Sequence, residues 1–128
     1  MIGEELQRRA RARVDELPGA RLEHPFGPDW EVFKVRDKVF MLMTDVTGEP
    51  IVILKTDPED GKALQEQHDD ITPGYHMNKK HWITLHPSGD LPTQLVDELV
   101  TDSYLLVVEN LPYAKRPVDP ATFGRDSR

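Results

Sequence analysis

The spacing of apolar residues along this chain changes abruptly at Pro18-Gly19. Before that point, apolar side chains recur every three or four residues from Ile2 to Leu17, which is typical of a helix with one buried side. Neither proline nor glycine continues a helix without a large cost. From Arg21 to Lys55 the apolar period is two, as in strands with distinct faces. The change of period therefore excludes an all-helical fold and an all-strand fold.

The period-two region divides into short strands joined by turns rich in glycine, proline and charge. The turns Arg36-Asp37-Lys38 and Thr47–Pro50 have the length of hairpin connections. Hairpin connections join antiparallel neighbours, so this region predicts an antiparallel meander. Four strands are predicted, at Leu22–His24, Trp30–Val35, Val39–Met43 and Ile51–Lys55.

The second half of the chain adds two helices and one strand. Asp57-Pro58 is a helix start, with an acidic cap followed by proline at the first helical position, and the helix runs to about His68. Residues 69–74 are predicted to be a loop. Trp82–His86 alternates as a strand, and a broad apolar stripe over residues 91–112 predicts a largely buried helix.

These elements, in their order along the chain, predict an α+β fold. An antiparallel sheet of about five strands carries helices packed on one face, in the order α-β-β-β-β-α-β-α. The 128 residues suit one domain, which we assign to residues 1–112. Residues 113–128 contain scattered prolines and charges, so we expect a loosely ordered C-terminal tail.

Composition narrows the class of protein. Sixteen Lys and Arg against 23 Asp and Glu give a formal charge of −7, which argues against a strongly basic nucleic-acid binder but not against a local basic patch. Cysteine is absent, so disulfides and thiolate chemistry are excluded. No apolar run is long enough to cross a bilayer, and the first ten residues lack a signal-peptide pattern. We expect a cytoplasmic protein with no membrane contact, and a monomer is favoured.

The most informative segment is Thr72–His86, which contains no acid and has a formal charge of +2. It follows Asp57–Asp70, which has six acids and one lysine. In the functional interpretation, the cations and imidazoles of the segment hold phosphate, with an aromatic ring as a stacking surface. In the structural interpretation, the lysines are solvated, Trp82 belongs to the core, and His76 with Asn78 holds the loop by hydrogen bonds. The sequence leaves both interpretations open.

Other chemistries find little support in the sequence. Five histidines are many for this length, but none has the spacing of a metal site. Serines lack a nucleophile motif, and glycines form no phosphate-binding loop. The arginines near the N-terminus are interpreted as a solvated helix face, with the ion pairs Glu4–Arg8 and Glu5–Arg9 one turn apart. We therefore predict no metal, no cofactor and no enzymatic activity.

Short motifs distributed over residues 2–112 match a known family, above all the pattern His-x-Asn-Lys-x-His-Trp within Tyr75–Trp82. The others are Leu17–Ala20, His24–Gly27 with Trp30, Lys38–Phe40, Leu54–Thr56, Ser103-Tyr104 and Leu111-Pro112. On these motifs the chain resembles the MmcQ/YjbR family of small bacterial proteins.

This resemblance implies a frataxin-like α+β sandwich and DNA binding, the label commonly given to the family. It places the recurrent polar positions of the family on Lys55, His76, Asn78, Lys79, His81 and Trp82. Frataxins are associated with iron through an acidic first helix, whereas four arginines offset the acids of the first helix here, so iron handling by that route is not expected.

Together these observations predict a small non-catalytic binding module for an anion, with DNA as the family-level ligand. Its predicted anion- or DNA-binding residues are Lys55, His76, Asn78, Lys79, Lys80, His81 and Trp82. Specific reading of bases is not expected, because no predicted helix presents Arg, Asn and Gln together on one face. The alternative is a domain that binds a small anionic metabolite or a protein partner.

Overall fold

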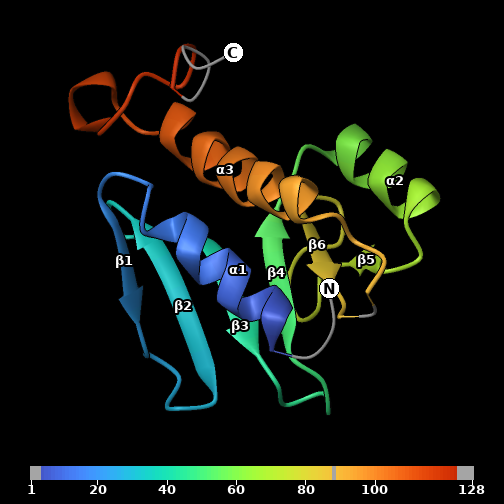
Figure 1. Ribbon diagram of the computed structural model, residues 1–128. Helices are drawn as coiled ribbons and strands as arrows, with labels where there is room; N and C mark the ends of the chain where they lie inside the picture. The colour runs from blue at the N-terminus through green and yellow to red at the C-terminus, as the bar shows by residue number, and fades with distance from the viewer. Residues whose placement is uncertain (1–3, 88, 124–128) are drawn as a thin grey trace.

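The computed structural model describes residues 4–87 and 89–123. Three helices and six strands follow one another along the chain (Figure 1). No helix within these residues is long and apolar enough to span a bilayer. The elements are α1 (Glu5–Val14), β1 (Ala20–Glu23), β2 (Trp30–Val35), β3 (Lys38–Thr44), β4 (Ile51–Lys55), α2 (Pro58–Gln67), β5 (Ile71–Pro73), β6 (Trp82–Leu85), α3 (Thr93–Glu109) and a 3₁₀ turn, η1 (Tyr113–Lys115).

All six strands form one antiparallel sheet in the spatial order β1-β2-β3-β4-β6-β5. The first four strands are the predicted meander. Arg36 and Asp37 form the turn between β2 and β3, and both have positive φ, which suits the right-handed twist of a two-residue hairpin. The α+β fold class is therefore confirmed.

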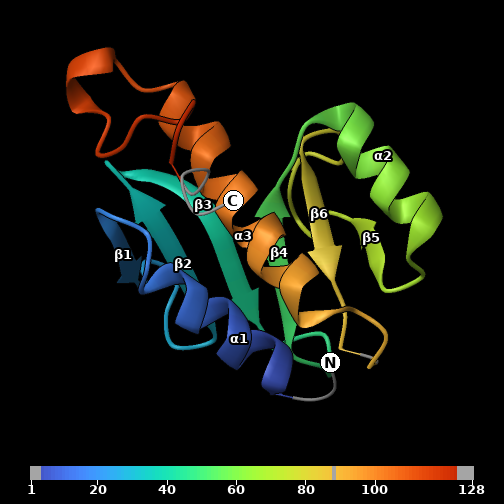
Figure 2. The same cartoon turned by 45° about the horizontal axis from the view of Figure 1, so that its top comes forward.

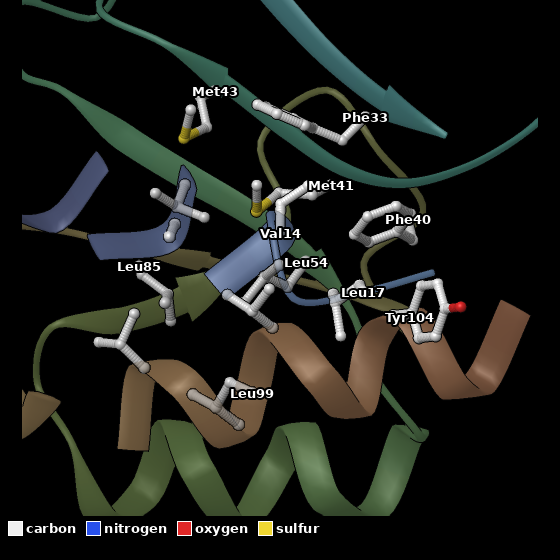
Figure 3. Close-up of a cluster of buried hydrophobic side chains, with 14 of the residues drawn as sticks. Val14, Leu17, Phe33, Phe40, Met41, Met43, Leu54, Leu85, Leu99 and Tyr104 are labelled. Carbon is white, nitrogen blue, oxygen red and sulfur yellow. The ribbon is translucent and has the colours of Figure 1, made fainter. Parts of the chain in front are cut away.

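Helices α1 and α3 lie side by side across one face of the sheet (Figure 1). Their apolar stripes pack on the inward-facing side chains of the central strands and bury one continuous core, part of which is drawn in Figure 3. At its centre, the rings of Phe40 and Tyr104 meet edge to face with centroids 5.5 Å apart. This is the core that the periodicity of both halves of the chain predicts.

Helix α2 begins as predicted and lies beside the β5–β6 edge of the sheet (Figure 2). The carboxylate of Asp57 accepts hydrogen bonds from the backbone N–H groups of Glu59 (3.0 Å) and Asp60 (3.4 Å), and Pro58 occupies the first helical position. Capping of this kind fixes where the helix starts, because it satisfies donors that have no partner inside the helix.

The prediction of a loop over residues 69–74 is wrong, because this segment contains a sixth strand. Ile71–Pro73 pairs with β6 at the edge of the sheet. Three residues are too few to show a period, and Pro73 is a residue that strands tolerate only at an edge, where its missing N–H is not needed. Sequence periodicity therefore cannot reveal this strand.

The face of the sheet opposite the helices also carries a core. Val32, Leu42, Ile51, Ile53 and Trp82 are buried there. The loop between β5 and β6 covers this face, with Tyr75 and Met77 packed against the buried cluster; Trp30 and Val39 complete it. Both faces of the sheet are thus covered, one by helices and the other by a loop.

The arginines of α1 do not form the predicted pairs with acids one turn earlier. Arg9 donates to Asp97 on α3, with Nε 2.8 Å from Oδ1, and Asp97 raises the pKa of Arg9 above its usual value. Arg11 pairs with Glu31 on β2, and Arg13 with Glu16. Arg9 and Arg11 thus take carboxylates from α3 and β2, whereas the partner of Arg13 is local. Arg8 and Arg9 are exposed, as predicted for a solvated helix face.

The start of the C-terminal tail is packed against the domain, contrary to the expectation of a loosely ordered segment. Val118 and Phe123 lie against the helix-side core, and Arg116 donates to the backbone oxygens of Glu109 (2.7 Å) and Leu111 (3.1 Å). These bonds satisfy carbonyls at the end of α3 that have no partner within the helix. Residues 124–128 of the predicted tail lie outside the described residues.

Tyr104 predicts how stability depends on alkaline pH. Its buried hydroxyl donates to the backbone oxygen of Pro18, and burial, opposed by the nearby charge of Arg36, raises its pKa to about 12. The folded state therefore keeps the phenol neutral at pH values where the unfolded chain ionises. The contribution of Tyr104 to the free energy of unfolding is fully present below about pH 10 and is lost as pH rises towards about 12. In urea titrations over this range, we expect the Tyr104→Phe variant to show a shallower loss of unfolding free energy; equal slopes would contradict this assignment.

Candidate anion-binding site

The loop between β5 and β6 is held by a close approach of its first residue to β6. Gly74 N–H donates to the backbone oxygen of Trp82 (2.8 Å), and a Cβ at Gly74 would lie 2.5 Å from the Cβ of Trp82. Only glycine fits so near another backbone without a shift of the strand. One residue later, Tyr75 N–H donates to Oγ1 of Thr84 (2.9 Å), which fixes the direction in which the loop crosses the sheet.

Two of the predicted site residues hold this loop together. Oδ1 of Asn78 accepts from the backbone N–H of Lys80 (2.9 Å), which is the structural role expected of this side chain. Nζ of Lys79 donates to the backbone oxygen of Gly74, across the base of the loop. These bonds favour the structural interpretation for Asn78 and give Lys79 a partner within the loop, although the Lys79 residue is exposed.

The aromatic residues of the loop also pack inward. Trp82 is only 8% exposed and lies in the second core, so its ring serves packing and has little surface for stacking on a base. Tyr75 is half-buried and parallel to Trp30, with centroids 6.3 Å apart. The exposed residue His76 has a positive φ of 59° and places its ring edge-on to Tyr75.

The remaining predicted residues gather at one end of the sheet. β4 ends at Lys55, which pairs with Trp82 at the start of β6, and Nζ of Lys55 lies 5.6 Å from the centre of the Trp82 ring. The exposed residues Lys80 and His81 directly precede Trp82, and the backbone oxygen of His81 accepts from Thr56 N–H (2.8 Å). The end of β4 at Lys55 thus lies beside the start of β6, which Lys80 and His81 directly precede.

Further cations, outside the set predicted from the sequence, lie at the same end. Lys38 starts β3 beside the end of β4, and together with Lys55 it lines a small pocket of about 270 Å³ over Trp82, near Asn110 and Leu111. In the β2–β3 turn, Arg36 donates through Nε to the backbone oxygen of Lys115 (2.9 Å). Figure 1 shows the C-terminal end of α3 and η1 at this end. We call the whole set the basic end: Arg36, Lys38, Lys55, Lys80, His81, Lys115 and Arg116.

The cations of the basic end have no carboxylate partners in the described part of the chain. Among residues 4–87 and 89–123, the lysines and arginines of this set form no ion pair, and the same holds for Arg8, Lys62 and Lys79 elsewhere. Five other cations each have a carboxylate partner: Arg9, Arg11, Arg13, Arg21 and Lys34. Two acids near this end are engaged by other groups: Asp37 lies 3.4 Å from Arg21, and Asp57 caps α2. The basic end thus combines uncompensated positive charge with a shallow pocket.

Comparisons with known proteins identify the same family as the loop motif. A family model described as YjbR matches residues 15–106. The chain belongs to the YjbR family. It is 42% identical over 116 residues to the uncharacterized protein YbdF of Escherichia coli O157:H7, covering 91% of this chain and 93% of that protein. It is 41% identical over 101 residues to the uncharacterized protein YjbR of Escherichia coli strain K12, covering 77% and 84%.

Solved structures of similar sequence share the fold of this YjbR family member. The crystal structure of Deinococcus radiodurans protein DR2400 is 38% identical with a TM-score of 0.77, covering 83% of this chain and 81% of that one. A crystal structure of a Pseudomonas syringae protein is 30% identical with a TM-score of 0.68, covering 78% and 96%. The resemblance read from the sequence is confirmed as family membership, and the DNA-binding label stays a prediction.

One further polar constellation was missed from the sequence because its members are far apart in the chain. Glu49 Oε1 contacts Nδ1 of His86, and Nε2 of His86 lies 2.8 Å from the hydroxyl of Thr72. It joins the β3–β4 turn to the β5–β6 edge of the sheet. Within the part of the chain that the structure describes, no three His, Asp or Glu side chains are placed to hold a metal ion.

Proposed function

We propose that this YjbR family member is a non-catalytic module that binds phosphate groups, with DNA as its ligand, at the basic end. The observation that carries the proposal is that several cations without an ion pair, within the described residues, lie at the same end of the sheet. Lysine ammonium groups on the rim of a shallow surface hold phosphate as point charges, without a defined orientation. Such contacts give affinity without sequence specificity.

The placement of the individual groups supports contact with a polymer. Lys38 and Lys55 lie over the pocket, Lys80 extends the surface along the loop, and Arg36 with Lys115 extends it towards α3. Tyr113, next to these cations, is 87% exposed and offers an aromatic face to a base or sugar. The net charge of −7 opposes approach at long range, so binding depends on these short-range contacts and on salt.

The test compares a double variant of the basic end with a matched control. We expect the wild-type protein to bind a fluorescent DNA duplex with an affinity that falls steeply as salt rises. Each lost phosphate contact lowers the slope of log affinity against log salt by about 0.9, so Lys55→Gln/Lys80→Gln should lower it by about one to two units. Arg8→Gln/Lys62→Gln removes the same charge from two other cations without an ion pair among the described residues, and should leave the slope unchanged.

A salt-independent affinity, or equal slopes for wild type and the Lys55/Lys80 variant, would refute DNA binding at this surface. The second candidate is a compact phosphate or carboxylate compound in the pocket between Lys38 and Lys55, whose volume of about 270 Å³ favours a small ligand. Thermal unfolding in the presence of inorganic phosphate, citrate or a nucleotide separates the two. A raised midpoint without DNA binding would assign the pocket to the small anion.

A further inference from the structure

A second surface, opposite in charge to the basic end, lies in a groove between α2 and α3. The groove has a volume of about 490 Å³ and shares only Lys55 with the pocket of the basic end. Figure 1 shows α2 on the side of α3 where the β5–β6 edge of the sheet lies, and residues along most of α3 line the groove. Apart from Lys55, no residue of the proposed DNA contact lines this groove.

The floor of the groove is apolar. Leu64 from α2 and Leu95, Leu105 and Leu106 from α3 are only half-buried, and all four line the groove. Another side of α3 faces the sheet, with Val96, Val100 and Tyr104 fully buried in the core. Helix α3 thus has a second apolar stripe that the rest of the described chain leaves partly uncovered, and partly exposed leucines in a concave site are a feature of protein-binding grooves.

The rim of the groove is acidic. Asp60 on α2 and Glu98, Asp102 and Glu109 on α3 line it, together with Asp57, whose carboxylate caps α2; Lys55 is the one cation of this lining. Carboxylates on both walls create a negative potential over an apolar floor. An occupant must therefore offer apolar side chains along its centre and positive charge along its flanks.

We infer that this groove binds a cationic amphipathic helix of a partner protein. The valley between two adjacent helices accepts the apolar face of a third, with anchor residues three and four positions apart. From Leu95 to Glu109 the axis of α3 rises by about 21 Å, which matches a bound helix of about 14 residues. Apolar side chains of that helix enter the floor, and its lysines or arginines meet Asp60 and Glu98 on opposite walls.

The test uses a synthetic fluorescent peptide of about 14 residues with leucines on one helical face and lysines elsewhere. A peptide of the same composition, scrambled to remove the apolar face, is the ligand control. At about 0.15 M salt we expect saturable one-to-one binding of the amphipathic peptide and binding at least tenfold weaker for the scrambled one. Asp60→Lys/Glu98→Lys should weaken the amphipathic peptide about tenfold, because two attractions become repulsions.

Two further variants separate the groove from the general acidity of the protein. Glu5→Lys/Asp15→Lys makes the same charge change at exposed positions on and beside α1 that do not line the groove, and should alter affinity less than about twofold. Leu106→Ser removes an apolar floor contact without a charge change and should weaken binding about tenfold. Circular dichroism melts establish that each variant is folded.

Several outcomes would overturn the inference. These are no binding of the amphipathic peptide, equal binding of the scrambled peptide, or equal loss in the two charge-reversal variants. Concentration-dependent dimerisation that Asp60→Lys/Glu98→Lys abolishes would assign the groove to a second copy of this chain instead. The DNA experiment changes Lys55 and Lys80. The peptide experiment changes other residues, namely Asp60, Glu98 and Leu106. A negative result in one experiment therefore does not contradict the proposal tested by the other.

Discussion

Replacing Trp82 with alanine is expected to lower the free energy of unfolding by about 3–5 kcal/mol, the range for buried aromatic residues in cores. Trp82 is 8% exposed and contacts the second core, on the face of the sheet that the β5–β6 loop covers. Its loss leaves a cavity between the strands and the loop and removes the ring beneath Lys55. Equilibrium denaturation in urea measures the effect.

Tyr113→Ala and Phe26→Ala are the matched controls, since both remove a large aromatic side chain that is mostly exposed. Each should change stability by less than about 0.5 kcal/mol. A loss of less than about 1 kcal/mol for Trp82→Ala would show that the core on the loop-covered face contributes little to stability. The Trp82 ring would then be available to contact a ligand. Trp82→Phe keeps an aromatic ring but removes part of its volume, so its loss of stability is expected to fall between these limits.

The second large effect is expected at Ser103, whose side chain bridges α3 to two strands. Its fully buried hydroxyl accepts from Lys55 N–H (2.8 Å) and donates to the backbone oxygen of Phe40. Ser103→Ala leaves a buried donor and a buried acceptor without this partner. At about 1–3 kcal/mol for each such group, we expect a loss of about 2–4 kcal/mol in the free energy of unfolding.

Thr93→Ala, at an exposed position in the same helix, is the control and should stay within about 0.5 kcal/mol of wild type. Because Ser103 binds the backbone of Lys55, its removal also loosens the end of β4 at the basic end. Amide hydrogen exchange should therefore accelerate at Lys55 more than at Ile53, in the middle of the strand. Unchanged exchange at Lys55 would contradict the bridging role.

The helix-side fold could be derived from the sequence because its signals are local. The period of α1, the alternation of β2 to β4 and the cap at Asp57 each depend on residues within a few positions of one another. The strand Ile71–Pro73 was missed because its pairing with β6 is decided across the sheet and leaves no period in three residues. The ion pairs of Arg9 and Arg11 were missed for the same reason, since their partners are distant in sequence.

The candidate site was only partly predictable. Lys55, Lys80 and His81 were selected from an acid-free segment and a family motif, and they are neighbours at the basic end. Asn78, Lys79 and Trp82 were selected by the same reasoning, yet their contacts are structural. A motif shows only that certain residues occur together. Holding a loop against a sheet requires particular residues as strongly as binding a ligand does, so the motif cannot distinguish the two roles.

By itself the sequence determined the α+β class, the helix α1, the antiparallel meander, the capped start of α2 and the family motif. These follow from periodicity, capping and turn chemistry, which act between residues close in the chain. The tertiary structure alone decided that the β5–β6 loop closes the second face of the sheet, which cations lack ion pairs among the described residues, and that acids of α2 and α3 line one groove. Burial and charge compensation depend on which distant residues meet in space, and that is settled only when the chain has folded.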